Sequence, residues 1–100
     1  METDFIIKLA KAYTEELWSD FANLFPQVNT DDAVLKEMPN DVVNVLVGLL
    51  GIEQVKEWVC TPLERLDNQI IKELIKTDTG LKAAKMFILS MRIWRKSHVI

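Results

Sequence analysis

The sequence predicts an all-α protein, a compact bundle of about five to seven helices, several of them short. Apolar residues recur at three- and four-residue spacing along most of the chain, and no run alternates with period two for long enough to indicate a strand. Prolines, glycines and short polar stretches interrupt this pattern and mark helix ends. The 100 residues, 49% apolar and 27% charged, have a globular composition and predict a single helical domain over residues 1–100.

The first long helix is expected from Asp4 to Phe25, directly before Pro26. Its apolar residues recur at helical spacing and form one wide stripe, which we expect to lie on the core. The stripe consists of Ile6, Leu9, Ala10, Tyr13, Leu17, Phe21 and Leu24. The pattern therefore predicts one uninterrupted helix over this part of the chain.

Two more helices are expected between Thr30 and Gly51. Thr30 can cap a short helix of about two turns that ends at Pro39. Asn40 can cap the next helix, whose apolar residues cover most of its circumference and place it in the middle of the core. Those residues are Val42, Val43, Leu46, Val47, Leu49 and Leu50. Gly51 fits the position just after this helix, where a left-handed residue is favoured.

Residues 52–59 are expected to form a short helix, with Trp58 in the core above the leucines that follow it. Cys60 is the only cysteine of the chain. Because free cysteine is among the most buried residue types, we expect Cys60 to be a small buried hydrophobic residue and not a nucleophile. A chain with one cysteine forms no internal disulfide, which fits a reducing cytoplasm.

The segment from Thr61 to Glu64 matches a capping box with proline at the first helical position, so a helical turn is expected to begin there. Asp67 and Asn68 supply a turn, because asparagine tolerates a positive φ. Residues 70–75 then resume a helical apolar stripe. This stretch therefore predicts two short helical segments that are joined by a tight turn.

Asp78 or Thr79 can cap the last helix. This helix is expected to pack on the core through Leu81, Ala84, Phe87, Ile88, Met91 and Trp94. A basic arc on another side consists of Lys82, Lys85, Arg92 and Lys96. Met86 and Ile93 fall on a third side and have no need to face the core, so the helix is either sandwiched between layers or part of an interface.

Charge is unevenly distributed along a chain of net charge −3. Residues 1–80 carry 15 acidic and 7 basic side chains, whereas residues 81–100 carry 5 basic and no acidic ones. The basic end either meets an anionic partner or neutralises the acidic body of its own fold. A pI near 5.1 lacks the broad positive surface of a protein that binds nucleic acid by itself.

The sequence offers no pattern of reaction chemistry. One cysteine, one histidine and the absence of a nucleophile elbow or phosphate-binding glycine loop predict that the chain is not an enzyme. No cofactor or metal site is expected, because no histidine and cysteine lie close together. His98 is expected to be a solvated residue. The longest apolar run, residues 45–52, is too short to cross a bilayer.

The second half of the chain carries an ordered series of short motifs, formed by Leu50, Gly51, Trp58, Thr61, Pro62, Leu66, Asp67, Glu73, Leu74, Ile75, Thr77 and Gly80. This pattern resembles the toxin-binding domain of the Xre/MbcA/ParS antitoxins. The match covers roughly residues 42–95, with Asn68 in place of the family's turn glycine and Ile70-Ile71 in place of its Thr-Pro helix start. Residues 1–40 are expected to form a helical N-terminal extension without a basic recognition helix.

The resemblance implies that residues 41–100 bind a RES-type toxin, an enzyme that consumes NAD, and cover its active site with C-terminal residues. By position in the chain, the contact residues would be Met86, Arg92, Ile93, Trp94, Arg95, Lys96, Val99 and Ile100. Two alternatives stay open: a small helical nucleic-acid-binding or transcription regulator that uses the basic last helix, and a structural homodimer.

Overall fold

The computed structural model describes residues 3–98, and over residues 92–98 it describes only the path of the helix. Within this part of the chain there are seven α-helices, a single 3₁₀ turn and no strand, so the predicted all-α fold is confirmed. The elements are α1 (Asp4–Ala12), α2 (Glu15–Ala22), α3 (Ala33–Lys36), α4 (Asn40–Leu50), α5 (Ile52–Trp58), the 3₁₀ turn η1 (Glu64–Leu66), α6 (Ile71–Leu74) and α7 (Asp78–His98).

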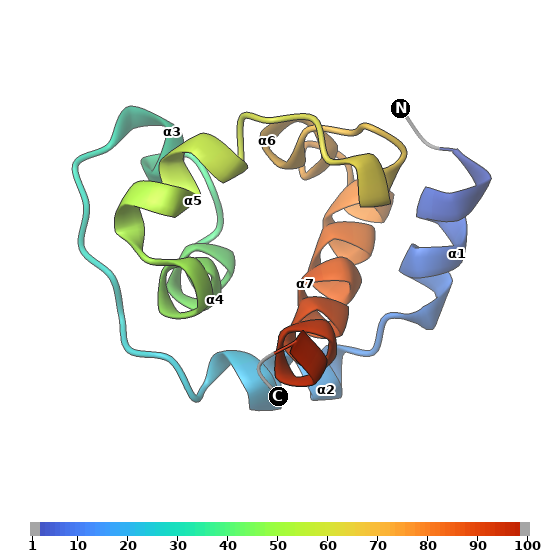
Figure 1. Cartoon of the computed structure of the whole chain (residues 1–100), viewed down its shortest axis with the longest axis horizontal. Coiled ribbons are helices and arrows are strands. Elements are labelled where there is room, and N and C mark those ends of the chain that lie inside the picture. The colour runs from blue at the N-terminus through green and yellow to red at the C-terminus, as the bar shows by residue number, and fades with distance from the viewer. Residues whose placement is uncertain (1–2, 99–100) are drawn as a thin grey trace.

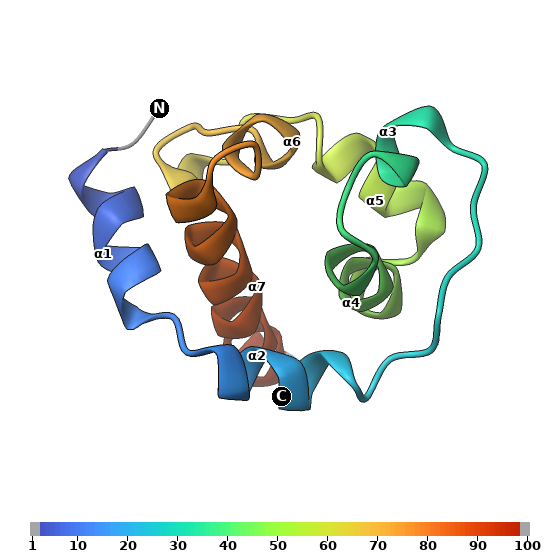
Figure 2. The same ribbon diagram turned by 180° about the vertical axis from the view of Figure 1, so that it is seen from behind.

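Helix α7 is the longest helix and the one around which the others are arranged. It contacts α1, α2, α4 and α6. Figures 1 and 2 show α1 beside α7 on one side, with α3, α4 and α5 grouped on the other, and α2 crossing near the C-terminal half of α7. The helix is therefore held from several directions by elements that lie far apart in the sequence.

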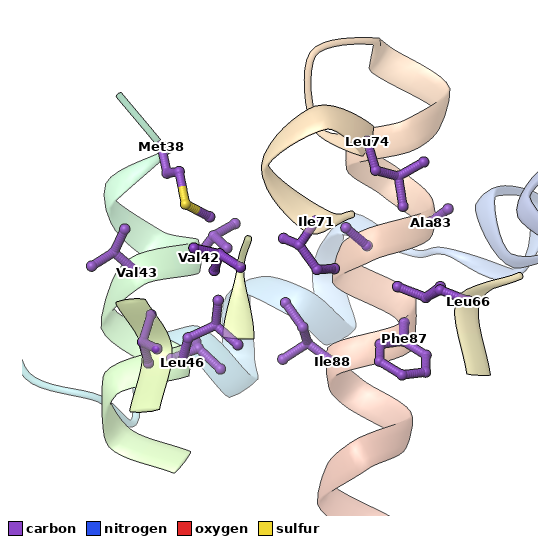
Figure 3. Close-up of a cluster of buried hydrophobic side chains, with 14 of the residues drawn as sticks. Met38, Val42, Val43, Leu46, Leu66, Ile71, Leu74, Ala83, Phe87 and Ile88 are labelled. Atoms are coloured by element: carbon purple, nitrogen blue, oxygen red, sulfur yellow. The ribbon is translucent and has the colours of Figure 1, made fainter. Parts of the chain in front are cut away.

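The core lies mainly between α7 and α4, with α6 at one end. Figure 3 shows Val42 and Leu46 of α4 pointing toward Ile71 of α6 and Ile88 of α7. All four of these side chains are fully buried. Each such aliphatic side chain contributes about 1.5 to 3 kcal/mol by leaving water, so this layer fixes the position of α7.

The predicted helix from Asp4 to Phe25 is wrong, because the chain breaks at Tyr13 and Thr14. Tyr13 (φ −65°, ψ 136°) and Thr14 (φ −127°, ψ 133°) are extended and separate α1 from α2. The break rotates α2 relative to the predicted stripe and turns Trp18 inward, where it is 1% exposed. Leu17 and Leu24, which were predicted in the core, are 59% and 73% exposed.

The caps of α3 and α4 also differ from the prediction. Asp32, and not Thr30, caps α3: its carboxylate accepts hydrogen bonds from the N–H groups of the second and third helical residues at 3.0 and 3.1 Å. Thr30 instead accepts the N–H of Asp32 at 3.1 Å. Helix α3 spans 4 residues and is shorter than the two turns expected. Pro39 occupies the cap position of α4, and Asn40 is its first helical residue.

The capping box predicted at Thr61 does not form. The Thr61 hydroxyl donates a hydrogen bond to the Glu57 carbonyl at 2.8 Å, and the 3₁₀ turn begins only after Leu63, without a side-chain cap. The predicted turn at Asp67 and Asn68 is confirmed, since both have positive φ values of 56° and 61°. Their left-handed conformations reverse the chain between η1 and α6.

Two glycines of the resemblance pattern are required by the backbone. Gly51 follows α4 with φ 87° and ψ 150°, a positive φ as predicted but an extended ψ. A Cβ atom at Gly80 would lie 1.9 Å from the carbonyl oxygen of Leu74, so no other residue fits without movement of α6. Thr77, and not Asp78 or Thr79, accepts the hydrogen bond of the Gly80 N–H at the start of α7, at 3.0 Å.

Across residues 3–98, every helix is too short or too polar to cross a membrane. This finding agrees with the short apolar run seen in the sequence.

Candidate partner-binding surfaces

The first half of α7 is anchored in the protein by its apolar and charged side chains alike. Ala83, Ala84, Phe87 and Ile88 are buried, as expected for the side that faces the core. Met91 is partly buried against the same core. The predicted core side of α7 is therefore confirmed as far as Met91, whereas the side chain of Trp94 lies beyond the described side chains.

Lys85 of α7 lies in a cluster that joins three helices. Its ammonium lies 5.6 Å from the centre of the Tyr13 ring and 5.5 Å from that of Trp18, and 3.6 Å from the Asp41 carboxylate. The Trp18 indole N–H donates to the same carboxylate at 2.8 Å. The Lys85 side chain is only 12% exposed, so its ammonium is largely shielded from water, which strengthens its attraction to the two rings and to the Asp41 carboxylate. The Asp41 side chain itself is 42% exposed.

Two ionisation equilibria in this cluster are displaced. Burial, the hydrogen bond to Glu15 and nearby negative charge raise the pKa of Tyr13 well above its ordinary value. The same hydrogen bond, which the Tyr13 hydroxyl donates at 2.5 Å, lowers the pKa of the Glu15 carboxyl. Both shifts favour the neutral phenol beside the charged carboxylate, and the hydrogen bond between these two groups links the two sides of the corner between α1 and α2.

The basic arc predicted on α7 is partly used inside the fold. Lys85 is held by Asp41 and two aromatic rings, and Lys82 forms an ion pair with Asp78 at 3.3 Å. Arg92 and Lys96 lie beyond the described side chains. Of the two basic side chains that the structure describes on this arc, Lys85 is largely withdrawn from solvent, and this weakens the case for nucleic-acid binding.

Trp58 is half-buried, although the sequence predicted it in the core. Its ring stacks near Phe87, with centroids 6.3 Å apart and planes inclined by 16°. Together with Leu63 and Met91, these two rings line a hollow of about 230 Å³ that opens beside α7; we call it the Trp58 hollow. Leu66, over which Trp58 was expected to lie, is fully buried beneath the surface.

Cys60 is exposed, so the prediction that it is buried is wrong. Helix α5 ends at Trp58, and the following Val59 takes the inward position with no exposed surface. Since neighbouring residues at a helix end project in different directions, Cys60 is left outside.

A second apolar hollow of about 350 Å³ lies where α2 crosses α7; we call it the α2–α7 groove. The exposed side chains of Leu17 and Leu24 form its α2 side, and the partly buried Met86 and Leu89 form its α7 side. Met86, predicted to face away from the core, does lie at this surface. The surface position of Leu17 and Leu24 was not predicted, because the apolar stripe of the expected Asp4–Phe25 helix placed both residues in the core.

A larger hollow of about 590 Å³ between α3 and α6 has mixed polar and apolar walls. Glu37, Lys72, Glu73 and Lys76 line it, and Glu73 and Lys76 form an ion pair at 3.0 Å. Charges of both signs in water give this surface no clear preference for a partner.

The remaining predicted contact residues follow Met86 along the chain. Helix α7 continues through Arg92, Ile93, Trp94, Arg95 and Lys96 to His98, with the side chains from residue 92 onward beyond those described. Val99 and Ile100 lie outside the described residues. Of the predicted contact residues, those from Met86 to Lys96 therefore belong to α7, and the first of them, Met86, lines the α2–α7 groove.

The described residues contain no group of three or more histidine, cysteine or acidic side chains that could hold a metal ion. Among them, every buried side-chain nitrogen or oxygen atom has a hydrogen-bond partner. The features of this part of the surface that stand out are apolar, namely the Trp58 hollow and the α2–α7 groove.

Comparison with protein-family models, with curated proteins and with solved structures gives no match for this chain.

Proposed function

We propose that the chain is an antitoxin-like protein-binding module that neutralises a RES-type, NAD-consuming toxin. The observation that carries this proposal is the Trp58 hollow, where two near-parallel aromatic rings line an opening beside α7. Aromatic residues in partly open pockets are the usual anchors of protein interfaces. A hollow of about 230 Å³ can receive an apolar side chain of a partner protein.

The resemblance to the Xre/MbcA/ParS antitoxins agrees with the backbone of residues 42–95. Gly51, Asp67 and Gly80 belong to the pattern, and each stands where the backbone restricts the residue type, through a positive φ or a close backbone contact. Asn68, which replaces the family's turn glycine, has the left-handed φ of 61° that such a glycine would supply. These positions support the use of the family as a guide to function.

In the proposed mechanism, the chain performs no chemistry and acts by blocking the toxin's active site. Burial of Ala83, Ala84 and Ile88 fixes the direction of α7 before the partner arrives, which lowers the entropy cost of binding. The C-terminal end of the helix and the residues after it then cover the toxin, and the Trp58 hollow receives an apolar group beside it. The covering residues are Met86, Arg92, Ile93, Trp94, Arg95, Lys96, Val99 and Ile100. We place this activity in the cytoplasm, because a lone thiol fits a reducing compartment.

Co-expression with a RES-type enzyme tests the proposal, with cell growth and cellular NAD as readouts. The full chain should restore both, whereas Trp58→Ala and a chain truncated after Met91 should restore neither. Phe5→Ala is the matched control, because Phe5 is a 39% exposed aromatic residue on α1 that does not line the hollow. Failure of the full chain to protect the cells would contradict the proposed function, and full protection by both altered chains would remove the hollow and the C-terminal end from it.

A further inference from the structure

The α2–α7 groove is lined mainly by apolar side chains, two of which are exposed. Leu17 and Leu24 are two of the three large apolar side chains described as exposed, and both line this groove. Leu17 lies in α2 and Leu24 in the turn after this helix, and both side chains line the same hollow. Met86 and Leu89 on α7 stand three residues apart, the spacing by which helices pack against one another. The groove is therefore shaped to receive a helix.

The charges around the groove indicate which kind of helix it receives. Asp20 lines the groove, and Glu16 lies one turn before it on α2. Both carboxylates are exposed, and neither forms an ion pair with a side chain that the structure describes. An acidic rim beside an apolar floor is complementary to an amphipathic helix that carries basic residues.

The chain itself supplies a helix of this kind. From residue 92 to residue 98, α7 carries Arg92, Arg95 and Lys96 and no acidic residue, interleaved with Ile93 and Trp94. This stretch continues the helix that already forms one wall of the groove. Two copies related by a two-fold axis could therefore exchange their α7 ends, each basic end meeting the acidic rim of the other copy.

We propose that the α2–α7 groove is the interface between two copies of this chain. The four helices of the interface are α2 and α7 of each copy, with Leu17, Leu24, Met86 and Leu89 as its apolar centre and Glu16 and Asp20 as its acidic rim. The inference goes beyond the proposed function, because it concerns the free chain and a groove that Trp58 does not line. It also implies that a toxin that contacts Met86 or the end of α7 competes with the second copy.

Sedimentation of the purified full chain, without any partner protein, tests this inference. The chain should dimerise at about 100 µM or below, and both Leu17→Lys and Leu24→Lys should raise the dissociation constant at least about tenfold. Asp20→Lys should also weaken the dimer, because it reverses a charge that faces the basic end of the other copy. Phe5→Lys and Glu37→Lys, which change exposed residues elsewhere, should leave the constant within about twofold.

Leu17, Asp20 and Leu24 are exposed, so these variants should keep the circular dichroism and melting temperature of the wild type. A chain that stays monomeric at every concentration would overturn the inference, as would a dimer that is insensitive to Leu24→Lys and Asp20→Lys. A monomer whose toxin binding is lost in Leu24→Lys would assign the groove to the toxin instead. A dimeric chain that fails to neutralise a toxin would leave the dimer standing and contradict only the proposed function.

Discussion

Two tryptophans on different sides of α7 have opposite surroundings. Trp18 is 1% exposed, donates a hydrogen bond to Asp41 and lies against the Lys85 ammonium. Trp58 is half-buried, stacks near Phe87 and lines an open hollow. A large aromatic residue in an amphipathic helix can therefore serve stability or recognition, depending on which elements cover it.

The covering layers explain the difference. Trp18 lies where α2 packs against α4 and α7, with the Lys85 ammonium over its ring, and the hydrogen bond to Asp41 ties its indole to α4. Trp58 lies between α7 and the irregular stretch around η1, where Leu63, Phe87 and Met91 leave a hollow of about 230 Å³ open beside its ring. We therefore expect loss of Trp18 to affect folding and loss of Trp58 to affect binding.

The largest expected effect is that of Trp18→Ala. It removes a fully buried ring and leaves both Asp41 and Lys85 without their shared partner, so the free energy of unfolding should fall by about 3 to 5 kcal/mol. Trp58→Ala should cost less, about 1 to 3 kcal/mol, because its ring is already partly in water. Urea unfolding followed by circular dichroism measures both values. An equal or greater loss for Trp58→Ala would break the comparison.

The next effect concerns the charge cluster on the Trp18 side. Asp41→Ala leaves the Lys85 ammonium and the Trp18 indole N–H without an acceptor in a shielded position, which should cost about 2 to 3 kcal/mol. Lys82→Met is the control, since the exposed ion pair of Lys82 with Asp78 is worth at most about 1 kcal/mol. The same urea titration should therefore separate the two variants clearly. Similar losses for both would mean that the cluster contributes no more than a surface pair.

A smaller effect distinguishes the two residues that could cap α3. Asp32→Ala removes two hydrogen bonds to helical N–H groups and should cost about 1 kcal/mol. Thr30→Ala removes one hydrogen bond before the helix and should cost less, about 0.5 kcal/mol. Thermal melts of the two variants give the order directly. A larger loss for Thr30→Ala would favour the cap that the sequence predicted.

The smallest change is a displaced titration at the corner between α1 and α2. Tyr13 is the only tyrosine, so tyrosinate absorbance reports on it alone. Because its pKa is raised in the folded state, its contribution to stability is complete below the ordinary value of 10.0 and is lost as pH rises toward the folded value. Tyrosinate should therefore appear well above pH 10 in the folded chain. A folded titration at the ordinary value would contradict the shielding of this corner.

The sequence predicted most of the helices because their apolar spacing is local. The predicted positive φ at Gly51 and at Asn68 is confirmed, and so is the core side of α7 through Phe87 and Ile88. These features depend on residues within one or two turns of each other. Local chemistry therefore sufficed to find them.

The errors arose where tertiary contacts override local spacing. Tyr13 and Leu17 lie four residues apart, so the apolar stripe passed through the break at Thr14 without a visible interruption. The acidic pair after Thr14 is a signal of a helix start that would have moved the register to Trp18. That Trp18 donates to Asp41, 23 residues away, is not visible in any short window. Because of this one misplaced helix boundary, the exposure of Leu17 and Leu24 was not predicted, and neither was the α2–α7 groove that they line.

The most direct test of the account compares Trp58→Ala with Asp32→Ala as inhibitors of NAD consumption by a purified RES-type enzyme. Trp58→Ala is expected to cost about 1 to 3 kcal/mol and Asp32→Ala about 1 kcal/mol, so both are compared under conditions where urea titration shows each variant to be folded, and a difference between them then reports on binding. We predict that Asp32→Ala inhibits like the wild type, whereas Trp58→Ala needs at least about tenfold more protein for the same inhibition. Equal inhibition by the two variants would contradict the assignment of recognition to the Trp58 side of α7.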